Sequence, residues 1–122
     1  MPEAVPDHAY VLRRAHETRE ERLAFAPTKD DTEGISVFWE SSEVTPDSIA
    51  KAARKPPKEY RVLRLKVAEV RRLGLSVILD EPPPRHCVIP EINTGNYKKT
   101  KDLQSALFRV SEEAELFFDD PS

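Results

Sequence analysis

The stretch from residue 59 to residue 92 constrains the fold more than any other part of the chain. Leu63, Leu65 and Val67 alternate with Arg64 and Lys66, which is the period of a half-buried β-strand, and Tyr60 and Val62 lie on the opposite face. Val67, Val70 and Leu73 then follow at a helical spacing of three, which is typical of a short helix with one buried stripe. Gly74 comes next and suits the left-handed residue that ends many helices. This region therefore predicts a strand followed by a short helix.

Two more strands and a rigid corner complete this unit. Residues 75–79 are almost all apolar, as expected of a strand that is covered on both faces. Pro82, Pro83 and Pro84 have no backbone N–H, so they cannot continue the ladder of that strand. Residues 87–89 predict a further short strand, which we place at an edge of the sheet.

The first half of the chain predicts two strands and a helix. Residues 8–15 open the domain as a strand, and residues 16–25 form either a short exposed helix or a mobile loop. In residues 35–39, Ile35, Val37 and Trp39 share one face, so we expect Trp39 to lie in the core. Thr45 is a good helix cap before a proline at the first helical position, and this helix runs to about residue 54.

The last third of the chain predicts its longest helix. It begins at residue 100 or 101 and runs to about Phe118, with an apolar stripe made of Leu103, Leu107, Val110 and Leu116. The expected fold is a single α+β domain, with a mixed or mostly antiparallel sheet of about four to five strands packed by this long C-terminal helix. We expect a flexible N-terminus at residues 1–7, the domain at residues 8–118 and an acidic tail at residues 119–122.

Length and composition exclude several classes of protein. A chain of 122 residues fits one domain. The single cysteine excludes an internal disulfide framework and favours a reducing cytoplasm. We find neither a secretory signal nor a run near the ~20 apolar residues of a membrane helix. A net charge of −3 argues against a dedicated nucleic-acid binder.

Charge is unevenly spread along the chain. Residues 51–72 contain nine basic and two acidic residues, whereas residues 111–122 contain five acidic residues and no basic one. Either these are solvated faces of different sign, or the acidic segment packs near the basic one, or one of them meets a partner of opposite charge. If a partner docks here, Arg61, Arg64, Arg71 and Arg72 are the expected binding residues.

The candidate catalytic residues lie next to the triple proline. His86 on a stiff corner suits a general base, and Arg85 suits an anion clamp. Cys87 follows, but neighbouring residues of a strand point to opposite faces, so His86 would not activate it. We therefore expect Cys87 to be structural. The scattered histidines and the lone cysteine give no metal site, and no motif indicates a cofactor.

Two runs carry a resemblance to a known group of proteins. Residues 34–39 read GISVFW, and residues 67–74 read VAEVRRLG; Pro84, His86, Ile89 and Pro90 follow. Over about half of the chain this pattern resembles short uncharacterised bacterial proteins found beside larger operon genes, including conflict and defence loci. The resemblance implies a partner more than a reaction.

The expected function is that of a small cytoplasmic bacterial accessory protein that binds another protein. The alternative is a small enzyme or nucleic-acid-processing factor that uses Arg85 and His86. The sequence leaves self-association open, and Phe117 and Phe118 are compatible with either a core or an interface.

Overall fold

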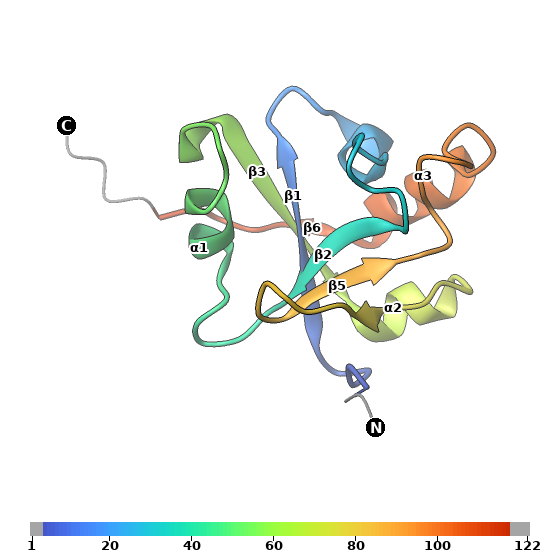
Figure 1. Ribbon diagram of the computed structural model, residues 1–122, viewed down its shortest axis with the longest axis horizontal. Coiled ribbons are helices and arrows are strands. Elements are labelled where there is room, and N and C mark those ends of the chain that lie inside the picture. Colours follow the sequence, from blue (N-terminus) through green and yellow to red (C-terminus); the bar gives the residue numbers. More distant parts are fainter. Residues whose placement is uncertain (1–3, 118–122) are drawn as a thin grey trace.

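In residues 4–117, which the computed structural model of the chain describes, six strands form one antiparallel sheet in the order β4-β5-β2-β1-β3-β6 (Figure 1). The strands are β1 (Tyr10–His16), β2 (Ile35–Trp39), β3 (Tyr60–Lys66), β4 (Ile78–Leu79), β5 (His86–Ile89) and β6 (Glu112–Glu113). The α-helices are α1 (Pro46–Lys51), α2 (Val67–Arg72) and α3 (Lys101–Val110), and the 3-10 turns are η1 (Glu21–Phe25) and η2 (Pro57–Glu59).

Hydrophobic side chains cover both faces of the central strands. The larger core joins one face to α2, α3 and η1, and its fully buried members include Phe25, Leu65 and Leu107. A smaller cluster on the other face packs Leu12 of β1 against Ile49 of α1. Figure 1 shows α1 on the opposite side of β1 and β3 from α2 and α3. The alternation along β1 and β3 therefore serves two cores rather than one core and solvent.

The strands β1 and β2 separate soon after they meet. Val11 and Leu12 are the residues of β1 that pair with β2, whereas β1 pairs with β3 along its whole length. Beyond Leu12 the link is made by a side chain, because Arg13 Nη1 donates to the Ser36 carbonyl at 3.0 Å. The divergence opens the space that becomes the cleft described below.

The α+β class is confirmed, but several details of the expected fold are wrong. β5 lies between β4 and β2 instead of at an edge, and α1 ends at Lys51 instead of about residue 54. The described residues form six strands rather than four to five, because the two-residue strand β6 leaves no periodic pattern, and the strand expected at residues 75–79 is reduced to Ile78–Leu79. The long C-terminal helix ends at Val110 instead of about residue 118. Ser111 is extended, and Glu112 and Glu113 pair with β3, so pairing with the sheet overrides the local helical pattern.

The described start of the chain is packed against the domain. Val5 is buried in the larger core, and Asp7 forms an ion pair with Arg71 of α2. Residues 1–3, Phe118 and the expected acidic tail at residues 119–122 lie outside the described residues. Across residues 4–117 no helix combines the length and apolar character that crossing a membrane requires.

Candidate functional site: a basic cleft beside the central strand

The side chain of Arg85 connects the proline corner to the end of β2. Its guanidinium lies 4.0 Å from the centre of the Trp39 ring, and its Nε donates to the Trp39 carbonyl at 2.9 Å. Its Nη2 donates to the Glu40 carbonyl at 3.2 Å. Trp39 is therefore half-buried, with one side against the larger core and the Arg85 guanidinium stacked over its ring. These contacts fix the position of the Arg85 guanidinium.

His86 and Cys87 point to opposite faces of β5, as expected. The Nδ1 atom of His86 lies 2.9 Å from the Asp80 carbonyl, and its ring meets the ring of Phe38 edge-on at 5.4 Å. Cys87 is completely buried, and this burial raises the pKa of its thiol to about 11. The thiol is therefore protonated at neutral pH, which agrees with a structural role and not with a nucleophile.

The four arginines expected to bind a partner are engaged within the chain. Arg61 pairs with Glu113 at 2.6 Å. Arg64 donates to both carboxylate oxygens of Glu40, at 2.9 and 2.6 Å, and this hydrogen bonding raises its pKa. In addition, Arg71 pairs with Asp7 and Arg72 with Glu69. Because Glu112 and Glu113 face Arg64 and Arg61, the acidic segment does pack near the basic one in this part of the chain.

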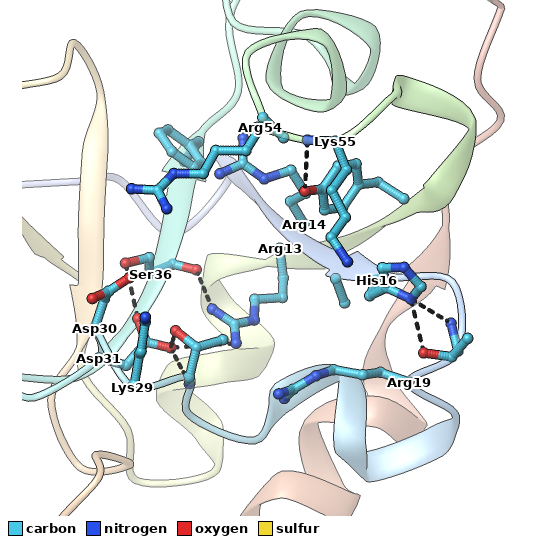
Figure 2. A pocket seen from close by; sticks show the side chains of 16 residues that line it. Arg13, Arg14, His16, Arg19, Lys29, Asp30, Asp31, Ser36, Arg54 and Lys55 are labelled. Atoms are coloured by element: carbon cyan, nitrogen blue, oxygen red, sulfur yellow. Dashed lines mark hydrogen bonds and ion pairs between the residues drawn. The ribbon is translucent and has the colours of Figure 1, made fainter.

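A different group of basic residues meets at a cleft of about 740 Å³ beside β1. The cleft is lined by side chains from four separate segments, namely residues 13–19, residues 28–38, residues 53–55 and Tyr60. Its charged members are Arg13, Arg14, Arg19, Lys29, Arg54, Lys55, Asp30 and Asp31, joined by His16. Figure 2 shows these side chains converging from the strand and from the surrounding loops.

The floor of the cleft is organised by the buried guanidinium of Arg13. Its Nε donates to the Ala24 carbonyl at 3.0 Å and its Nη2 to the Ala26 carbonyl at 2.9 Å. Nη2 also lies 3.5 Å from Asp31 Oδ2. Burial lowers the pKa of Arg13, and the Asp31 carboxylate opposes this effect. Arg13 thus ties η1, β2 and the loop before β2 into one frame.

The loop that carries Lys29 is held in place by Asp31. Oδ2 of Asp31 accepts from the Thr28 backbone N–H at 2.8 Å, and Oδ1 accepts from the Ser36 hydroxyl at 3.2 Å. The carboxylate of Asp31 is therefore satisfied by internal donors and is not the main counter-charge of the cleft. Lys29 itself is exposed on this fixed loop.

Arg14 lies between two aromatic rings in the same cleft. Its guanidinium carbon is 5.9 Å from the centre of the Phe38 ring and 5.7 Å from that of Tyr60. One Nη atom donates to the Ile49 carbonyl at 2.5 Å. Burial lowers the pKa of Arg14, with a smaller opposing contribution from Tyr60. The result is a partly desolvated cation whose charge is not matched by a carboxylate of the described residues.

Sequence reasoning did not find this cleft. The sequence of β1 contained one indication of a buried charge. Arg13 occupies an inward position between the buried residues Val11 and Ala15. A charged residue at such a position calls for buried partners. Arg54 and Lys55 lie within the basic run that we noted, but their closeness to β1 depends on the fold.

The chemistry available in the cleft is that of cations and hydrogen-bond donors. His16 lines the cleft with an imidazole ring, whose Nδ1 atom is 2.8 Å from the Thr18 hydroxyl. Within residues 4–117 no group of three or more His, Cys, Asp or Glu residues is placed to hold a metal ion. The arrangement is suited to holding an anion by charge and hydrogen bonds.

Comparison with known proteins adds no family to this description. We compared the chain with protein-family models, with curated proteins and with solved structures, and none of them matches.

Proposed function

We propose that this chain is a small accessory binding protein that captures an anionic group in its basic cleft. One observation carries the proposal: six Arg and Lys side chains and two carboxylates line a single cleft, in a chain whose net charge is −3. A local excess of positive charge on an acidic chain is the electrostatic pattern of an anion site.

The exposed cations of the cleft have the freedom to meet a ligand. Lys29, Arg54 and Lys55 are exposed and make no ion pair among residues 4–117. Their concave setting beside Arg14 raises the local concentration of anions. The four arginines expected from the sequence are less suited, because each would have to leave an internal carboxylate first.

Binding has more support than catalysis. The side chains of Arg85 and His86 are engaged with the backbone of neighbouring segments, and neither lines the cleft. The hydroxyl of Ser36, which does line it, donates to Asp31. We retain the bacterial cytoplasm and a partner protein as the setting of this proposal, in which anion capture serves the partner.

The test measures anion binding to two variants of equal charge. Arg54→Gln/Lys55→Gln removes two cations of the cleft, and Lys51→Gln/Lys58→Gln removes two exposed cations of the same region that do not line it. Titration calorimetry at low salt with orthophosphate and tripolyphosphate would compare them. We expect the first variant to bind about tenfold more weakly, the equivalent of ~1.4 kcal/mol, and the second to bind like the wild type.

Two further observations would bear on the proposal. Raising the salt concentration should weaken binding, because screening acts on exposed charges. Equal affinity of the two double variants would contradict the assignment of the cleft. Arg71→Glu/Arg72→Glu and His86→Ala serve as comparators for the docking and enzyme alternatives, and neither should change anion affinity by more than about twofold.

A further inference from the structure

The cations of the cleft are spread over two ends and a middle rather than gathered at one point. Figure 2 shows Arg54 extending toward the side of Ser36 and Asp30, whereas Lys55 points toward His16. On the basis of the proposed function, we infer that the cleft takes a short chain of linked phosphates rather than a single phosphate. Each end would hold one phosphate, and Arg14 would face the link between them.

The first end is formed by Lys29 and Arg54. Lys29 is carried by the loop that Asp31 fixes through Thr28 and Ser36. Arg54 reaches the same side from the segment that follows α1 (Figure 2). Asp30 also lies at this end. Its carboxylate would repel any additional anionic group of a ligand that is bulkier than a phosphate chain.

The second end is formed by Lys55 and His16, whereas the Arg19 guanidinium donates to the Leu23 and Ala26 carbonyls. The Lys55 backbone N–H donates to the Tyr60 hydroxyl at 3.3 Å, and the Tyr60 ring meets the His16 ring edge-on at 6.2 Å. Lys55, Tyr60 and His16, from three segments, are thereby held together at this end.

The size of the cleft and the spacing of the charges favour linked phosphates. A cavity of about 740 Å³ lies in the range of small-molecule sites, roughly 300–1,000 Å³. An extended acidic peptide alternates its side chains between two faces, so it presents only every second carboxylate to one wall. Linked phosphates carry charge at each unit and accept paired hydrogen bonds from arginine.

The experiment compares phosphate chains of different length on three single variants. Titration calorimetry would use orthophosphate, pyrophosphate and tripolyphosphate with Lys29→Gln, Lys55→Gln and the exposed control Lys51→Gln. We expect tripolyphosphate to bind at least tenfold more tightly than orthophosphate. Lys29→Gln and Lys55→Gln should each weaken tripolyphosphate binding about three- to tenfold, while Lys51→Gln leaves it unchanged. Unchanged thermal midpoints would show that all three variants are folded.

Each outcome has a defined meaning. Orthophosphate that binds as tightly as tripolyphosphate would overturn the two-ended site, and so would loss of tripolyphosphate affinity from one end alone. If no anion binds at all, the proposed function itself fails, which is a different result.

Binding of adenosine triphosphate would show whether the linked phosphates belong to a nucleotide or to a free phosphate chain. Tighter binding than tripolyphosphate supports a nucleotide whose ring rests near Phe38 or Tyr60, which line the cleft. Equal or weaker binding supports a free phosphate chain. A single-stranded oligonucleotide that displaces both would overturn a small-molecule site.

Discussion

Replacing Arg13 with methionine should destabilise the protein more than the loss of any exposed ion pair. The wild-type guanidinium is buried and lies within hydrogen-bonding distance of three backbone carbonyls and Asp31. Methionine is shorter and has no donors, so the carbonyl of Ala24 loses its side-chain donor and Asp31 loses its cation. Asp31 would then be a buried carboxylate without a counter-charge.

The expected loss of unfolding free energy follows from the cost of removing one partner of the buried Arg13–Asp31 ion pair. Removing one partner of such a pair costs about 3–5 kcal/mol. For a domain of this length, 1 kcal/mol corresponds to roughly 3–6 °C in the melting temperature. We therefore expect Arg13→Met to lower the melting temperature by ~10–25 °C. Arg72→Met, which breaks an exposed pair with Glu69, should cost less than ~1 kcal/mol.

Urea unfolding followed by circular dichroism would measure both variants. The double variant Arg13→Met/Asp31→Asn removes the uncompensated charge, so it should be less destabilised than the sum of its single variants. An Arg13→Met protein within about 1 kcal/mol of the wild type would refute the reasoning. It would mean that the carbonyls and Asp31 find other donors without cost.

Three further predictions concern buried groups and the backbone. Phe25→Ala should cost ~3–5 kcal/mol by denaturant unfolding, and Leu23→Ala in the same turn less than ~1 kcal/mol, because Phe25 is 0% and Leu23 44% exposed; equal losses would contradict this packing. The pKa of Cys87 is raised from 9.0 to about 11, so the thiol stabilises the fold fully below pH 9 and progressively less up to pH 11. A Cys87→Ala protein with the same decrease across that range would disprove its contribution. Gly34→Ala should unfold at a lower temperature than Gly74→Ala, since a Cβ at Gly34 would lie 2.7 Å from a backbone oxygen and one at Gly74 would meet nothing within 4 Å; thermal melts in the opposite order would refute this.

The sequence was most informative where a pattern extended over a whole element. The alternation around Leu63 and Leu65 predicted a strand, and this strand is β3. Thr45 caps α1 as expected, accepting from the Ser48 backbone N–H. The two residues of β6 carry no such periodicity, which is why that strand was missed, and β4 covers only the last two residues of the strand expected at residues 75–79. Leu116 belonged to the expected helical stripe, but it packs against the smaller cluster after the chain has left α3.

The cleft was outside the reach of local patterns for a different reason. Arg13, Lys29 and Arg54 come from segments whose closeness is decided by the divergence of β1 from β2 and by the position of α1. Arg85 and His86 were singled out as neighbours of a rigid corner, and the structure engages both side chains in local contacts. A cluster of charges along the sequence and a cluster in space are thus different properties, because only the second depends on the fold.

The pairing of Glu112 and Glu113 with β3 bears on how copies of the protein behave toward one another. An uncovered outer strand offers a row of open backbone groups, on which a second molecule can build and so begin aggregation. β6 covers the middle of β3 with two charged residues, and Ala114 adds a hydrogen bond to Val62. The glutamates would repel the same edge of a neighbouring copy. A chain cut after Ser111 would lose this cover, and polymerisation through β3 would become its main risk.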